Sequence, residues 1–115
     1  MKTHHALLFL LFLSFNAIAD TTKEIQHLLS YVKSTECQYE RNGNMHSGTE
    51  AVAHIKKKYD YYYDDIKTTE DFIEYSATQS KLSGRSYQIH CANQPTVTSR
   101  EWLLLELALF RSTQG

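Results

Sequence analysis

An excess of basic residues is the first thing that this sequence lacks. Its 115 residues carry 12 lysines and arginines against 13 aspartates and glutamates, a formal net charge of −1. Nucleic acids and anionic membranes are bound by a concentrated basic excess, so neither is an expected partner. Only four glycines and one proline are present. The sequence has no glycine-rich phosphate loop, no Rossmann signature and no serine-nucleophile motif, so no standard enzyme motif is available.

A hydrophobic run long enough to span a membrane is absent as well. The apolar stretch over residues 6–19 has 14 residues, whereas a membrane-spanning helix needs about 20. Small residues at Ala17 and Ala19 predict a secretory signal peptide over residues 1–19, cleaved before Asp20. No cysteine stands directly after that point to carry a lipid. We therefore expect a single domain over residues 20–115 that is secreted, or periplasmic in a Gram-negative source, without stable membrane insertion.

Cysteine is scarce, and both cysteines lie in the predicted exported part. In an oxidising compartment, Cys37 and Cys91 are expected to form one disulfide. In the chain-entropy model, closing a loop of about 55 residues stabilises the fold by about 4 kcal/mol. A redox or nucleophilic cysteine is the alternative, but a Cys-x-x-Cys pair is missing. His90, next to Cys91, points to the other face of a strand.

Capping motifs and hydrophobic periodicity define the expected elements. Thr21 with Glu24, Ser47 with Glu50, Thr68 with Asp71 and Thr98 with Glu101 are typical of helix N-termini. Asn42-Gly43 favours a two-residue hairpin turn. Four helices are expected: one of about four turns from residue 21, one over about 48–66, one from 68 to a stop at Gly84, and one over about 99–111. Three strands are expected: one that begins at residue 37, its hairpin partner through 45–46, and one over 87–91. Residues 92–97 are expected to form a loop. The predicted fold class is α+β, one small domain of four helices and a small antiparallel sheet in the order α-β-β-α-α-β-α.

Histidine and carboxylate residues give one candidate for catalysis. His54 follows Glu50 by four residues on the second helix, so the two share a face with Lys58 and Tyr61. Glu50 could orient His54 as a base or metal ligand, but a capping role for Glu50 is the favoured interpretation. The spacing of the histidines is not that of a structural zinc site. We expect no metal, no cofactor and no catalytic activity.

Tyrosines and lysines crowd the same helix. The run over residues 59–65 contains four tyrosines and three aspartates, and tyrosines give rigid contact area for sugars or peptides. The alternative is that Tyr59 and Tyr62 belong to the core while Tyr61 and Tyr63 are solvated. The three lysines at 56–58 are expected to form a solvated face paired with the following aspartates. Nothing in the sequence indicates that Arg41, Lys81 and Arg85 converge.

The last predicted helix is apolar nearly all round. Leu103, Leu107 and Phe110 form one stripe, and a second stripe follows on the other side of the helix. A chain of this length has little material to enclose a helix fully. The second stripe is therefore a candidate face for a partner or a second copy of the chain. It comprises Trp102, Leu105 and Leu109.

Several of these stretches together resemble a known family. The stretches are Arg41-Asn42-Gly43, Glu50-Ala51 with His54, Ile66-Lys67-Thr68 running into Glu70-Asp71-Phe72-Ile73-Glu74, Ser80 with Ser83-Gly84 and Tyr87, and Trp102-Leu103. Their order and spacing resemble the YfeK-like family of small bacterial envelope proteins, a domain of unknown function. The resemblance implies an exported single-domain protein with no assigned activity, cofactor or catalytic residue.

The function expected from the sequence is that of a non-enzymatic binding or interaction module of the cell envelope. Its partner would be an envelope protein, or a second copy of the chain bound through the last helix. One alternative is a small hydrolase or metal-dependent enzyme that uses Glu50 and His54. Another is glycan or peptide binding in a tyrosine-lined pocket. The candidate binding residues are Arg41, His54, Tyr61, Tyr87, Leu105 and Leu109.

Overall fold

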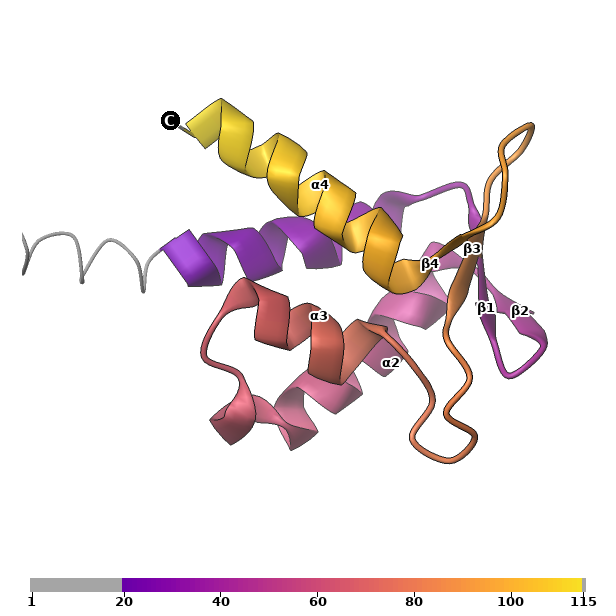
Figure 1. Ribbon diagram of the computed structural model, residues 1–115, viewed down its shortest axis with the longest axis horizontal. Helices are drawn as coiled ribbons and strands as arrows, with labels where there is room; N and C mark the ends of the chain where they lie inside the picture. Colours follow the sequence, from indigo (N-terminus) through magenta and orange to yellow (C-terminus); the bar gives the residue numbers. More distant parts are fainter. Residues whose placement is uncertain (1–19, 115) are drawn as a thin grey trace, which may run out of the picture.

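The computed structural model describes residues 20–114, in which helices pack beside a small sheet (Figure 1). The predicted signal peptide, residues 1–19, lies outside the described residues. An N-terminal helix (residues 20–34) is followed by β1 (Gln38–Arg41), β2 (Asn44–His46), α2 (Gly48–Tyr61), the 3-10 turn η1 (Tyr63–Asp65), α3 (Thr69–Ala77), β3 (Gln88–His90), β4 (Val97–Thr98) and α4 (Ser99–Gln114). The predicted α+β class and element order are confirmed. Among residues 20–114, no helix is both long enough and apolar enough to cross a bilayer.

The sheet is antiparallel, with strand order β2-β1-β3-β4. The predicted hairpin turn is confirmed, since Asn42 and Gly43 have φ angles of 52° and 82°, the positive values that this two-residue turn requires. The predicted Cys37–Cys91 disulfide is present and joins the start of β1 to the residue after β3. The predicted loop over residues 92–97 was wrong at its end, because Val97 belongs to β4 and pairs with Ile89 of β3. A two-residue strand has too short a pattern to be recognised locally.

Two of the predicted capping boxes form in full, and at the start of α4 the Thr98 hydroxyl accepts from the Glu101 amide at 3.1 Å, as predicted. Ser47 caps α2 with Glu50, and Thr68 caps α3 with Asp71. The predicted cap at Thr21 was wrong, because residue 20 is already helical. The Glu24 side chain bonds to side chains of other helices.

Three helix ends also differ from the expectation. Helix α3 ends at Ala77 rather than at Gly84, which has a φ angle of 71° in the segment between α3 and β3. Helix α2 ends at Tyr61 rather than near residue 66, and the η1 turn that follows buries no residue. A longer α2 would therefore gain little packing there. Helix α4 continues three residues beyond Arg111, to Gln114.

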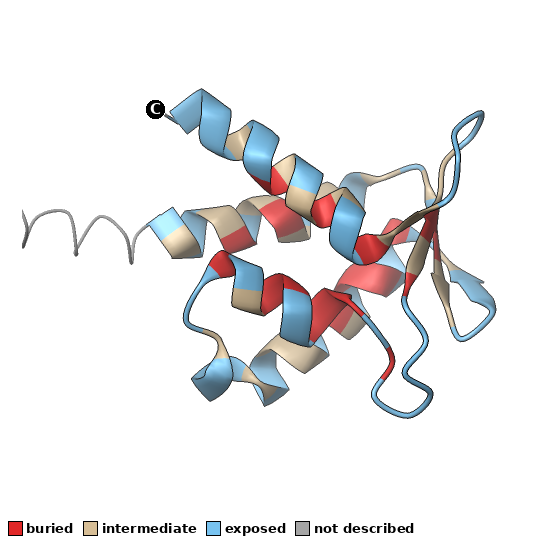
Figure 2. Ribbon diagram, in the orientation of Figure 1, coloured by how far each residue is buried: buried red, intermediate tan, exposed pale blue. Residues whose placement is uncertain are grey.

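The core lies between the helices and against one face of the sheet, as the red segments of Figure 2 show. Gly48 permits one close contact, since a Cβ atom there would lie 2.3 Å from the Val32 carbonyl oxygen. The start of α2 therefore packs directly on the end of the N-terminal helix. The core is built from Ile25, Leu28, Val32, Tyr39, Ala51, Val52, Ile55, Phe72, Ile73, Ala77, Tyr87, Ile89, Leu103 and Leu107.

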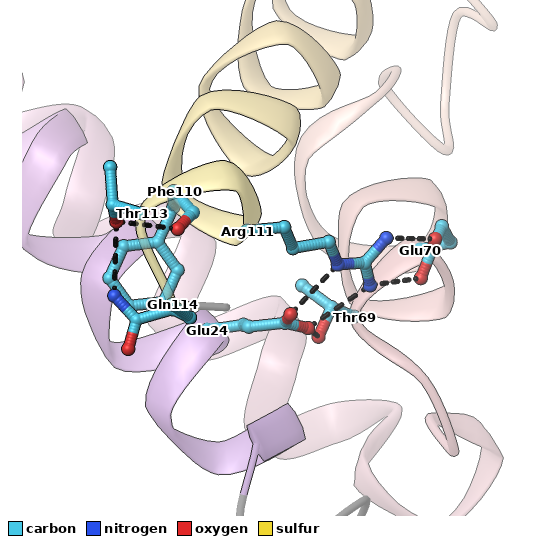
Figure 3. Close-up of polar contacts among 7 residues, drawn as sticks. All are labelled: Glu24, Thr69, Glu70, Phe110, Arg111, Thr113 and Gln114. Atoms are coloured by element: carbon cyan, nitrogen blue, oxygen red, sulfur yellow. Dashed lines mark hydrogen bonds and ion pairs between the residues drawn. The ribbon is translucent and has the colours of Figure 1, made fainter.

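Three helices are joined by one arginine, which Figure 3 shows between two carboxylates. Arg111 of α4 donates to Glu24 of the N-terminal helix at 2.8 and 3.1 Å, and to Glu70 of α3 at the same two distances. Thr69 donates to Glu24 at 2.6 Å. The Arg111 hydrogen bonds lower the pKa values of both glutamates. We call these four residues the Arg111 cluster.

Candidate functional site

A cavity of about 510 Å³ opens beside the hairpin turn and one flank of α2. We call it the basic pocket, because lysine and arginine side chains line it and no carboxylate does. Its volume lies within the usual range for small-molecule sites. The lining residues are Arg41, Asn42, His54, Lys57, Lys58, Tyr61, Tyr62, Ser80, Lys81, Leu82 and Tyr87.

Helix α2 supplies one wall of the basic pocket through its periodicity. His54, Lys57, Lys58 and Tyr61 occupy positions i, i+3, i+4 and i+7, which lie on one helix face. The buried residues of the same helix, such as Val52 and Ile55, turn toward the core. The helix thus presents a polar, cationic flank to the cavity while its apolar face holds it in place.

A second wall is the segment between α3 and β3, which is tied to the hairpin turn. The Asn42 amide nitrogen donates to the Ser80 hydroxyl at 3.2 Å, and the Ser83 hydroxyl donates to the Asn42 side-chain oxygen at 2.6 Å. Within the segment, the Gly84 amide donates to the Ser80 carbonyl at 2.9 Å. These bonds fix Ser80 and its neighbour Lys81 beside the end of β1, where Arg41 lies.

His54 lies between Arg41 and Tyr87. The Arg41 Nη1 atom is 2.9 Å from His54 Nδ1 and 3.1 Å from Nε2, and Nε2 is 3.3 Å from the Tyr87 hydroxyl. Both neighbours are satisfied when Arg41 donates to an unprotonated Nδ1 and Nε2–H donates to Tyr87. Burial lowers the pKa of His54 to about 4, with the charges of Arg41 and Lys58 adding to the effect. His54 is therefore a neutral donor and acceptor at physiological pH.

Lys58 is bonded to neutral groups rather than to a carboxylate. Its Nζ donates to the Gln79 carbonyl at 2.8 Å and to the Tyr87 hydroxyl at 3.1 Å. Burial lowers its pKa, and the nearby charges of Lys81 and Arg41 lower it further. The expected pairing of the lysine run with the following aspartates was wrong among residues 20–114, where no such ion pair forms. The helix turns Lys57 and Lys58 along the cavity flank, and the chain leaves α2 at Tyr61, before Asp64 and Asp65.

The remaining cations of the pocket keep their charge available. Lys81 lies 5.3 Å from the centre of the Tyr62 ring, a cation–π contact that leaves its N–H groups able to donate to a ligand. Lys57 is exposed on the α2 flank. Neither these two lysines nor Arg41 and Lys58 are ion-paired with a carboxylate of the described chain.

The structure brings together four of the six candidate binding residues named from the sequence. Arg41, His54, Tyr61 and Tyr87 all line the basic pocket, with Tyr87 buried and Tyr61 81% exposed. Leu105 and Leu109 do not line it; they lie on α4 and are 62% and 54% exposed. Trp102, from the same predicted stripe, instead packs on Tyr31 of the N-terminal helix. Partner binding or self-association through the two leucines stays a prediction.

Sequence reasoning missed several lining residues. Lys57 shares the helical flank of His54, so the spacing on α2 was a usable signal for it. Lys81, Asn42 and Ser80 gave no such signal, because their proximity depends on contacts between the segment after α3 and the hairpin turn, about 40 residues apart.

The proposed pairing of Glu50 with His54 does not form. The Glu50 carboxylate accepts from the Ser47 amide at 3.0 Å and lies 3.8 Å from His46 Nδ1. The capping interpretation of Glu50 is confirmed. Within residues 20–114, no three His, Cys, Asp or Glu side chains are placed to hold a metal ion together.

Comparison with known families gives a match over most of the chain. Residues 19–111 match the model of DUF5329, a family of unknown function. Comparison with the curated proteins and with the solved structures finds no match. The match spans nearly all of the described fold, including both walls of the basic pocket. The chain therefore belongs to the DUF5329 family.

Proposed function

We propose that the protein is an exported, non-enzymatic binding module of the cell envelope, and that the basic pocket is its binding site. The observation that carries the proposal is the convergence of Arg41, His54, Tyr61 and Tyr87 in one cavity. These residues come from β1, from α2 and from the segment before β3. A cavity lined by hydrogen-bonding groups and tyrosines from three segments has the composition of a small-molecule or glycan site.

Export is supported by two independent features. The apolar leader with small residues before Asp20 has the pattern of a cleaved signal peptide. The Cys37–Cys91 disulfide belongs to an oxidising compartment rather than to the cytosol. The resemblance to small bacterial envelope proteins agrees with the first of these features. Intact-mass measurement of the protein from a cell-envelope fraction should give a chain that begins at Asp20 and is lighter by two hydrogens than the reduced form. A full-length, reduced chain would contradict export.

We propose binding rather than catalysis because of the hydrogen bonds that the pocket side chains make. The His54 lone pair on Nδ1 faces the Arg41 guanidinium, so it is not open to take a proton from a substrate. Glu50, the partner that would orient His54, is used as a helix cap. The arrangement supports binding rather than general base catalysis.

Binding at the basic pocket is tested by NMR shift mapping with a panel of monosaccharides, sugar phosphates, amino sugars and short peptides. We expect at least one member to shift the amide signals around Arg41, His54 and Tyr87. The matched variants are Tyr61→Ala, which alters the pocket rim, and Tyr63→Ala, which removes an exposed tyrosine outside the pocket. Tyr61→Ala should weaken the binding several-fold and Tyr63→Ala should not. Shifts that map outside the pocket, or no shifts from the whole panel, would overturn the proposal.

A further inference from the structure

We infer that the basic pocket binds a phosphate monoester, with the phosphate group among the cations and a ring-shaped organic part, such as a sugar, on the tyrosine rim. This inference rests on the proposed function of the pocket and names the chemistry of its ligand. It is carried by the four unpaired cations, by an unused donor at Ser80, and by the exposed aromatic rim. Each of these is argued in turn.

The charge of the pocket calls for an anion. Arg41, Lys57, Lys58 and Lys81 line one cavity, and no carboxylate lines it with them. Like charges gathered in this way repel one another, and the repulsion is strongest where water is partly excluded. The lowered pKa values of His54 and Lys58 are consistent with this, since nearby cations contribute to both. A dianion in the cavity would relieve the repulsion, because no aspartate or glutamate among the lining residues does so.

Neutral donors complete the polar wall. Ser80 is 6% exposed, and its hydroxyl oxygen accepts from the Asn42 amide nitrogen and from the Ser83 backbone amide. The Ser80 hydroxyl proton has no acceptor among residues 20–114, so it can be donated to a ligand oxygen. A buried hydroxyl that keeps its proton beside a lysine is suited to an anionic oxygen.

The type of cation favours phosphate over carboxylate. A planar carboxylate is bound best by the two parallel N–H groups of an arginine, but Arg41 already directs Nη1 at His54. The other three cations are lysines, which act as separate point charges. They approach the cavity from α2 and from the segment after α3. Donors that converge from several directions fit the tetrahedral oxygens of a phosphate.

The size and rim of the pocket call for more than a phosphate ion. A cavity of about 510 Å³ is far larger than one phosphate group. Tyr61 is 81% exposed at its edge, and the Tyr62 ring lies under Lys81. Tyrosine rings present flat apolar faces with polar tips, which suit the ring of a sugar. A phosphorylated sugar would fill both parts of the cavity.

The inference is tested by isothermal titration of the purified protein with α-D-glucose 1-phosphate, glucose, glucuronate and inorganic phosphate. We expect glucose 1-phosphate to bind about tenfold or more tightly than each of the other three, since it alone has both parts. Equal binding of glucuronate or of glucose would overturn the choice of phosphate and leave the proposed binding function standing. Equal binding of inorganic phosphate would overturn the assignment of the rim to a sugar ring.

Three lysine variants provide the matched control. Lys57→Gln and Lys81→Gln each remove one pocket charge from an exposed side chain and should weaken the binding of glucose 1-phosphate about fivefold. Lys56→Gln removes a charge from the neighbouring exposed position of α2, which does not line the pocket, and should leave the affinity within about twofold. Equal effects of all three variants would mean that the net positive charge of this surface attracts the ligand without a defined site. That result would overturn the inference.

Discussion

Two cavities of the described chain, each lined by an arginine, differ in what surrounds that charge. Arg111 lines a cavity of about 340 Å³ together with Glu24 and Asp20, and its guanidinium is bonded to two carboxylates. Arg41 lines the basic pocket, where no lining residue is acidic. The first arginine has its counter-charges within the fold, and the second does not. Charge that the fold neutralises serves to hold elements together, whereas charge that it leaves unpaired in a cavity is available to a ligand.

Removing the disulfide should have the largest effect on the pocket side of this comparison. Cys37 and Cys91 join β1, which carries Arg41, to β3. Replacing both by serine releases a loop closed across 54 positions and should lower the free energy of unfolding by about 4 kcal/mol. Urea unfolding of the variant measures the loss, and the wild type under reducing conditions should match it. A loss below about 1 kcal/mol would mean that the β1 wall does not depend on the covalent link.

Arg111→Ala tests the charge-paired side of the comparison. Glu24 is only 12% exposed and would lose the arginine that bonds it, so we expect a loss of about 1–2 kcal/mol in the free energy of unfolding. Arg100→Ala is the matched control on the same helix, because Arg100 and Glu74 are both more than half exposed. Its expected loss is below about 0.5 kcal/mol. Equal urea midpoints for the two variants would contradict a structural role for the Arg111 cluster.

The contribution of Arg111 should also depend on pH. Its hydrogen bonds lower the pKa values of Glu24 and Glu70 from the ordinary 4.5. A carboxyl group with a lowered pKa stabilises the folded state above its unfolded pKa, and the stabilisation is lost as the pH falls through the folded value. The unfolding curves of the wild type and Arg111→Ala should therefore differ at pH 7 and approach each other in acid.

The features that could be predicted from the sequence are those whose cause is local. The turn at Asn42-Gly43 and the cap of Ser47 with Glu50 each depend on residues a few positions apart, and both form. The predicted helix start at Thr21 was wrong because residue 20 is already helical, and the Glu24 carboxylate bonds to Arg111 and Thr69, which are far away in the sequence. A local pattern identifies a possible bond, but it does not reveal the bonds that the same side chain makes to distant parts of the chain.

The candidate site shows the same limit. His54, Lys58 and Tyr61 share a face by helical spacing, so their grouping was visible in the sequence. The position of the segment before β3 decides whether Lys58 pairs with an aspartate or bonds to Tyr87. In the structure, Lys58 donates to the Tyr87 hydroxyl. Lys81 joins the pocket only through the bonds that tie its segment to the hairpin turn. The positive pocket is therefore a tertiary feature, which a net charge of −1 conceals.

His54 gives a pH response on the unpaired side of the comparison. Its pKa of about 4 in the folded protein lies below the ordinary 6.5, so the unfolded chain takes up the proton first as the pH falls. The free energy of unfolding should therefore decrease as the pH falls from about 6.5 to about 4. With solvent screening, the expected decrease is about 1 kcal/mol. His54→Gln should lack this part of the pH dependence. NMR titration of the ring protons checks the pKa, and a value near 6.5 would contradict the burial and the neighbouring positive charges that lower it. Addition of glucose 1-phosphate should raise the pKa, because the phosphate offsets the surrounding positive charge.

The smallest effect is expected on a surface that belongs to neither of the two cavities. Leu105 and Leu109 are already exposed on α4, so replacing both by glutamate should change the free energy of unfolding by no more than about 0.5 kcal/mol. Binding at the basic pocket should be unchanged, since neither leucine lines it. If this face joins two copies of the chain, as the apolar pattern of α4 predicts, the wild type should gain mass with concentration in light scattering and the double variant should not. A wild type that stays monomeric would remove self-association and leave the basic pocket as the proposed binding surface.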